Sequence, residues 1–307
     1  MNSMSAPLIS PLSGCNNFQG IKWLREGAKL SMRAALHPVA TRVWIEFLNS
    51  DSFFANLVGA RPQLVGKVYR PYQTNTISCF QRVALLIGHY RFVQRIGWAP
   101  LIRCAAVRPV ELAAISGKGG AQYRIELCAV EPMQREGELV LRLMCEDILV
   151  YSCAFTFVQT DQDMKLGVGC MQGPGGGNGL QLIRTATRDL HGLRPKNLMI
   201  KLLSALGSEV GCKQMQLVSN RNRVVLGAQR QGKVHADYDD FWLSCGATHA
   251  SDGNFLLPCG AIEEPDLRDT ISSKRSMMRK RYEMMSHLVG TLLTTFNMTS
   301  TRSHYRP

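Results

Sequence analysis

Residues 166–177 read LGVGCMQGPGGG, an apolar run that passes directly into a glycine-rich loop. Helical periodicity begins at residue 180, a second apolar run covers residues 215–219, and the aromatic sequence YDDFW follows at 238–242. In several folds this order of strand, glycine loop, helix, strand and aromatic helix presents backbone N–H groups to a phosphate-bearing ligand. The pattern therefore predicts a nucleotide-like or acyl-carrier cofactor at the loop.

Upstream of the loop, apolar and polar residues alternate in three segments, 123–130, 138–144 and 148–158. Short polar turns separate these segments, which is typical of an antiparallel meander. The apolar run before the glycine loop would then be its fourth strand.

Downstream of the loop, residues 180–190 and 195–206 have the spacing of apolar positions expected of helices, and residues 213–219 and 255–257 read as strands. The predicted fold class is α+β, with a mixed, largely antiparallel central sheet, flanking helices and a helical N-terminal portion.

The chain divides by composition into four parts. Residues 1–20 are rich in Ser, Pro, Gly and Asn, and we expect them to be disordered. A helical region over 21–120, an α/β domain over 121–260, and a basic C-terminal helix and tail over 261–307 follow.

The helix predicted at residues 21–36 is basic and amphipathic, and Pro38 ends it. One interpretation is a helix that lies on a membrane surface. We favour the other, a helix packed on the body of the protein with its basic face in water.

The formal net charge of +13 over 307 residues favours an anionic partner such as acidic lipid, RNA or a phosphorylated small molecule. The ten cysteines lack the spacing of a structural zinc site, so we expect no metal and a reduced, cytoplasmic-type protein. Apolar segments are too short to span a bilayer and no signal peptide is evident, which leaves peripheral contact with the inner membrane. The absence of a Gly-x-Ser-x-Gly motif disfavours a hydrolase.

The glycine loop and a nearby cationic segment form the candidate cofactor site. Backbone amides of the loop can approach a diphosphate closely, and cations at the start of the second predicted helix would add charge where the helix dipole already favours an anion. A flexible connection followed by solvated arginines is the competing interpretation. The candidate cofactor-binding residues are Gln172, Gly173, Gly175, Gly177, Arg194 and Lys196.

The aromatic segment supplies the candidate catalytic residues. Tyr238 is a candidate general acid toward a leaving thiolate, and His235 or Asp239 is a candidate base toward an amine. The alternative is a core helix whose rings pack under the sheet and whose acids cap it.

A basic cluster opens the last predicted helix and would suit lipid headgroups or RNA. A solvated helix that pairs with the acids before it is the alternative. The cluster comprises Lys274, Arg275, Arg279, Lys280 and Arg281.

Taken together, several short motifs resemble the VirK/YbjX family of Gram-negative bacteria over about residues 60–285. The motifs are QGP at 172–174, GLRPK at 192–196, VSN at 218–220, YDDFW at 238–242, FLLP at 255–258, SKR at 273–275, HY at 89–90 and EGEL at 136–139. The resemblance implies a role in the cell envelope, in virulence and in resistance to cationic antimicrobial peptides. It implies no established reaction.

The order of elements from residue 138 to residue 258 also resembles the Gcn5-related (GNAT-like) acyltransferases, whose glycine loop Gln172, Gly175 and Gly177 match. Two predicted helices, where those enzymes have one, separate the loop from the next strand. This resemblance implies acetyl-CoA or a longer acyl-CoA as cofactor, bound by residues 121–260, and an envelope component or protein as acceptor. The competing hypothesis is a non-catalytic adaptor that binds envelope proteins, anionic lipid or RNA; we expect no DNA partner, and the oligomeric state stays open.

Overall fold

The computed structural model describes residues 8–160, 163–224, 237–268 and 271–301. Its helices are α1 (Gly20–Leu36), α2 (Pro38–Leu48), α3 (Ser52–Ala60), α4 (Gln63–Gly66), α5 (Cys79–Arg95), α6 (Ala99–Val107), α7 (Gly179–Asp189), α8 (Pro195–Glu209), α10 (Asp239–Ser244) and α11 (Ser272–Thr301), with short 3-10 turns η1 (Pro11–Cys15), η2 (Lys67–Tyr69) and η3 (Asn220–Asn222). Its strands are β1 (Val110–Ser116), β2 (Gln122–Ala129), β3 (Leu139–Cys145), β4 (Ile148–Gln159), β5 (Met164–Gln172), β6 (Gln214–Leu217), β7 (Thr248–His249) and β8 (Phe255–Pro258). None of the described helices is both long enough and apolar enough to cross a membrane.

The described strands form one sheet in the order β1-β2-β3-β4-β5-β6-β8-β7. Its first five strands are an antiparallel meander, and β5 and β6 form the one parallel pair among the described strands. A parallel pair needs a crossover connection, which α7 and α8 supply. The predicted α+β class with a mixed, largely antiparallel sheet is confirmed.

Local sequence explains where the main helices begin and end. Pro38 occupies the first turn of α2 and Pro195 the first turn of α8, positions where the missing N–H costs nothing. Ser78 and Gln81 form a reciprocal capping box at the start of α5. After α8 the chain reverses at Gly211, whose φ of +84° is favourable only without a side chain.

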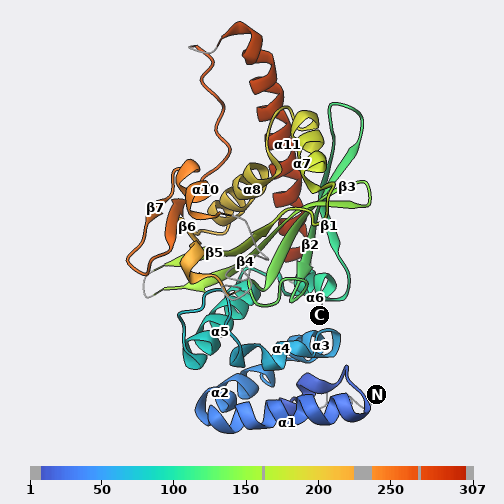
Figure 1. Cartoon of the computed structure of the whole chain (residues 1–307), viewed down its shortest axis with the longest axis vertical. Coiled ribbons are helices and arrows are strands. Elements are labelled where there is room, and N and C mark those ends of the chain that lie inside the picture. The colour runs from blue at the N-terminus through green and yellow to red at the C-terminus, as the bar shows by residue number, and fades with distance from the viewer. Residues whose placement is uncertain (1–7, 161–162, 225–236, 269–270, 302–307) are drawn as a thin grey trace.

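The helices lie in layers around the sheet (Figure 1). Helices α1 to α4 form a separate layer at the end of the molecule opposite the start of α11, and α5 and α6 lie between this layer and the sheet (Figure 1). Helix α1 is the outermost element of the layer (Figure 1).

Helix α11 is part of the core rather than a separate tail. Its first turns project beyond the body, and its second half passes along β1 toward α6 (Figure 1). Leu288, Leu292 and Phe296 of this half are at most 1% exposed, and the Phe296 ring packs at a tilt against Trp98 with ring centroids 4.1 Å apart. The basic helix predicted after residue 261 is present, but its apolar face helps to build the domain.

Two sequence predictions need correction. Residues 8–20 are not disordered, because Ile9 and Cys15 are buried and Asn49 hydrogen bonds both the N–H and the C=O of Ile9. The predicted boundary at residue 120 falls inside a hairpin, because β1 pairs with β2 along its whole length. Helix α6 and strand β1 were missed since their short, alanine-containing sequences have no clear period.

Candidate functional site

The glycine loop borders an open groove of about 930 Å³. The groove lies between the end of β5, the start of β4 and helix α7, and Gln172, Gly173 and Gly175 line it. A Cβ atom at Gly175 or Gly177 would meet nothing within 4 Å, and the N–H groups of both residues make no hydrogen bond with any described residue. The loop is therefore open to a ligand, although no charged side chain lines the groove in the described part of the chain.

The predicted cations lie apart from this groove. Arg194 is the exposed N-cap residue of α8, and the ammonium of Lys196 lies 4.1 Å from the ring centroid of Phe241 in α10. Partial burial, with a smaller contribution from Arg194, lowers the pKa of Lys196. The structure thus does not gather the loop and these two cations around one cavity.

Tyr238 joins the segment before α10 to strand β5. Pairing of β5 with β6 ends where the N–H of Val218 donates to Val168 O, while β5 continues along β4 to Gln172. In the space between the strands, the Tyr238 hydroxyl donates to Met171 O (2.6 Å) and accepts from Met171 N (2.7 Å). Burial raises the pKa of this phenol well above its usual value, so it stays protonated. The geometry gives Tyr238 a structural role, and its role as a general acid stays a prediction.

The other predicted catalytic residues have different positions. Asp239 accepts a hydrogen bond from the N–H of Asn220 (2.8 Å), which ties α10 to the turn after β6. His235 lies outside the described residues. Of the three, Tyr238 and Asp239 lie next to each other, where Tyr238 contacts the end of β5 and Asp239 contacts the turn after β6.

The basic cluster of α11 divides into exposed and bound side chains. Lys274, Arg279 and Lys280 are exposed. The Arg281 guanidinium donates twice to His191 O (3.0 and 3.2 Å), and Arg275 donates to Arg268 O (3.3 Å). Arg281 therefore fastens α11 to the α7–α8 connection.

A fully buried charge cluster lies where α5 and η2 meet β3. The Glu138 carboxylate accepts from the Lys67 ammonium (2.5 Å) and from the Tyr90 hydroxyl (2.5 Å), and both side chains of the Lys67–Glu138 pair are at most 2% exposed. Tyr72 and Thr156 complete the cluster through a hydroxyl–hydroxyl bond of 2.7 Å, and Thr156 also accepts from the N–H of Glu138. Despite its burial, Glu138 has a lowered pKa because the Lys67 ammonium and the Tyr90 hydroxyl stabilise the carboxylate.

His89 flanks this cluster as a neutral imidazole. Its Nδ1 atom accepts from the N–H of Phe157 (3.1 Å), and its ring stacks on Phe157. Burial lowers the pKa of His89 to about 4. Its Nε2 atom is buried without a hydrogen-bond partner in the described part of the chain.

Two glycines, Gly137 and Gly169, allow the close backbone packing that places the Glu138 side chain in the core. A Cβ at Gly137 would lie 2.6 Å from Phe155 N, and one at Gly169 would lie 1.9 Å from Glu136 O. The motif EGEL at 136–139 is thus explained by close backbone packing plus one buried carboxylate. With HY at 89–90, it forms a single structural unit.

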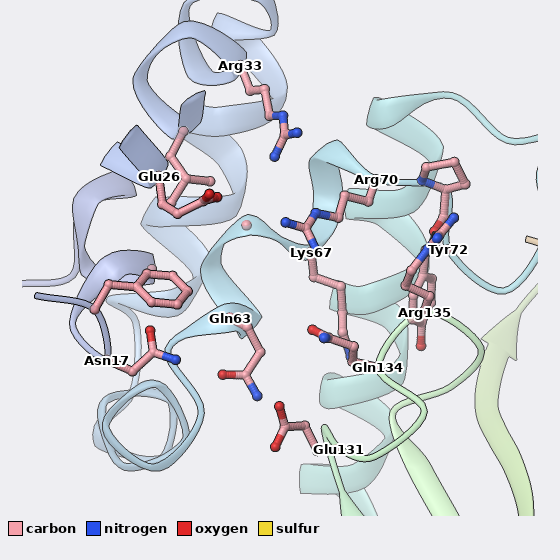
Figure 2. A pocket seen from close by; sticks show the side chains of 15 residues that line it. Asn17, Glu26, Arg33, Gln63, Lys67, Arg70, Tyr72, Glu131, Gln134 and Arg135 are labelled. Atoms are coloured by element: carbon pink, nitrogen blue, oxygen red, sulfur yellow. Dashed lines mark hydrogen bonds between the residues drawn. The ribbon is translucent and has the colours of Figure 1, made fainter. Parts of the chain in front are cut away.

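Beside the buried cluster lies a polar pocket of about 250 Å³. Helix α1, the α4–η2 segment and the loop 131–135 line it, and the guanidinium groups of Arg33 and Arg70 reach into it (Figure 2). Sequence reasoning missed this pocket, because its residues come from segments more than a hundred positions apart and follow no motif.

Comparison with known proteins agrees with the earlier resemblance. The chain is 28% identical to the uncharacterized protein YbjX of Escherichia coli (strain K12) over 276 residues, which cover 87% of this chain and 82% of that protein. It is 24% identical to the membrane protein LapB of Mannheimia haemolytica over 212 residues, 69% of this chain and 88% of that protein. No solved structure matches the chain significantly.

The family model described as "Protein of unknown function (DUF535)" matches residues 19–293, which include the sheet, the glycine loop, the buried charge cluster and most of α11. The chain therefore belongs to the DUF535 family, to which its VirK/YbjX-like motifs had pointed.

Proposed function

We propose that the chain acts at the cell envelope as an acyl-CoA-dependent N- or O-acyltransferase. The observation that carries the proposal is the open glycine loop at the mouth of the 930 Å³ groove between the end of β5, the start of β4 and α7. The name of the Mannheimia haemolytica relative, membrane protein LapB, supports the envelope as the place of action. Roles in virulence and in resistance to antimicrobial peptides belong to the same proposal.

The groove suits the chemistry of an acyl-CoA. Its volume lies in the usual range of ligand pockets, about 300–1,000 Å³. Met133, Leu149 and Leu182 offer apolar contact to an acyl chain, while the loop amides offer donors to the diphosphate. In this proposal the amides hold the diphosphate without Arg194 and Lys196. Tyr238 would have to exchange its bond to Met171 O for the departing thiolate.

Thermal unfolding with acetyl-CoA and palmitoyl-CoA tests the proposal. We expect ligand-dependent stabilisation, about 2.7 kcal/mol at a hundredfold excess over Kd, and its loss in Gly175→Val and Gly177→Val. Both positions have open space and neither has a positive φ, so the variants should fold normally. Gly260→Val, equally open, is the matched control. Absence of stabilisation by any acyl-CoA would exclude the transferase.

A second candidate function, an adaptor on anionic lipid, is favoured by the outer face of α1. Ile21, Leu24, Met32 and Leu36 are 85%, 62%, 58% and 66% exposed, an unusual amount of apolar surface for a helix of the outermost layer. Basic residues flank this surface, namely Lys22, Arg25 and Lys29. Such a helix can insert its apolar side between lipids while the cations contact acidic headgroups.

Sedimentation with phosphatidylglycerol vesicles tests this candidate. We expect Leu24→Glu with Met32→Glu to reduce binding at least tenfold, because two charges would enter the lipid boundary. Val107→Glu on α6 is the control, since Val107 is also exposed (68%) but lies in a different layer. Binding that survives the α1 double variant, and falls when Lys274 and Arg279 are neutralised, would assign the lipid contact to α11 instead.

A further inference from the structure

The polar pocket beside the buried charge cluster has an excess of positive charge. Four cationic side chains line it, Arg33, Lys67, Arg70 and Arg135, against two carboxylates, Glu26 and Glu131. Figure 2 shows Arg33 reaching in from α1 and Arg70 from the facing wall, so that their guanidinium groups share one space.

Both carboxylates that line the pocket are already neutralised. Glu26 accepts from Lys29 (2.8 Å) and pairs with Arg25 (3.3 Å), and Glu131 accepts from Arg61 (2.9 Å). These pairs remove the acids as partners for the pocket cations.

The four pocket cations differ in whether their side chains already have an ion-pair or hydrogen-bond partner in the protein. Glu138 holds the Lys67 ammonium, and Arg135 donates to the carbonyls of Pro71 and Val224. The guanidinium groups of Arg33 and Arg70 make no hydrogen bond and no ion pair with any described residue; only the backbone of these two residues hydrogen bonds, Arg33 O with His37 N and Arg70 N with Lys67 O. Two unneutralised guanidinium groups that face each other repel, and a bound anion would relieve the repulsion.

We propose that this pocket binds a phosphate monoester, with Arg33 and Arg70 as its charged ligands. A guanidinium matches phosphate oxygens in a planar, two-bond geometry, which suits a site with two arginines. Asn17, Gln63 and Gln134 line the same pocket and supply neutral donors (Figure 2). At about 250 Å³ the pocket is smaller than usual ligand sites, so the ligand is compact and distinct from an acyl-CoA in the groove.

The phosphate monoester has two sources, a small soluble metabolite or the headgroup of a lipid such as phosphatidic acid. Titration calorimetry with glycerol 3-phosphate tests the first, and co-sedimentation with vesicles of phosphatidylcholine, with and without phosphatidic acid, tests the second. Full-length protein is used in both. The site predicts at least tenfold weaker binding for Arg33→Gln and for Arg70→Gln in whichever arm binds.

Arg42→Gln on the neighbouring helix α2 is the matched control, because it removes the same charge from an exposed position outside the pocket. Binding of glycerol 3-phosphate that depends on Arg33 and Arg70 but not on Arg42 establishes the pocket with a soluble ligand. The same dependence seen only with phosphatidic acid vesicles establishes it with a lipid headgroup. Equal losses in all three variants, or no binding in either arm, would overturn the proposal, and neither result depends on the acyl-CoA groove.

Discussion

Replacement of Lys67 by methionine is expected to lower the free energy of unfolding by about 3–5 kcal/mol. The variant leaves the Glu138 carboxylate buried with only the Tyr90 hydroxyl as a side-chain partner. An unpaired charge in such a place costs far more than the lost attraction of an exposed pair, because water no longer solvates it. Chemical denaturation with urea measures the effect.

Two further variants show whether the cost comes from the unpaired charge. Lys67→Met combined with Glu138→Gln should recover more than half of the loss, since a neutral amide still accepts from Tyr90. Lys213→Met removes a cation from the exposed Lys213–Asp163 pair (3.3 Å) and should cost less than about 1 kcal/mol. If Lys67→Met is no more costly than Lys213→Met, the buried pair does not stabilise the fold as we infer.

Stability is expected to fall by on the order of 3 kcal/mol as the pH is lowered from 6.5 to about 4, owing to His89 alone. The pKa of His89 is about 4 in the folded chain because burial disfavours the imidazolium, whereas an exposed histidine has a pKa near 6.5. Above pH 6.5 both states are neutral and no stability is lost. Between the two values the unfolded chain binds a proton that the folded chain does not, so unfolding becomes more favourable as the pH falls.

Glu138 acts in the same direction at lower pH. Its pKa is lowered in the folded state, so the stability it contributes is present above its ordinary pKa and is lost as the pH falls through the folded value.

Urea denaturation at pH 7.5, 6.5, 5.5 and 4.5 measures how the free energy of unfolding depends on pH. His89→Gln should flatten it between pH 6.5 and 4.5, and His249→Gln, at an exposed position of β7, should not. A profile that is unchanged by His89→Gln would show that another group is responsible.

Most elements could be predicted from local patterns, because these patterns carry the physical cause of the element. Alternation in residues 123–158 reflects strands with two different faces, and Pro38 and Pro195 mark helix starts through their fixed φ. The errors fell where the pattern is weak. Strand β1 is an edge strand whose burial depends on α11, more than 150 residues later in the chain.

Among the candidate sites, only the glycine loop could be predicted from the sequence, whereas the positions of the cations could not. The glycine loop could be found from sequence because its residues are consecutive, and the structure places it beside a groove. The predicted grouping of Arg194 and Lys196 with this loop was not observed, because helix α7 and the reversal at His191 and Gly192 place both cations at the start of α8, beside α10. Arg33 and Arg70 gave no local signal at all.

By itself the sequence determined the α+β class, the order of the strands from β2 to β5, the position of the glycine loop and the strongly basic character of the chain, since each depends on neighbouring residues or on composition. Only the tertiary structure decided that Lys67, Tyr90 and Glu138 meet in one buried cluster and that Arg33 faces Arg70 across a pocket. The reason is physical: a lysine or an arginine looks the same in sequence whether its charge is in water, paired in the core or left without a counterion. That difference is set by which distant segments pack around it.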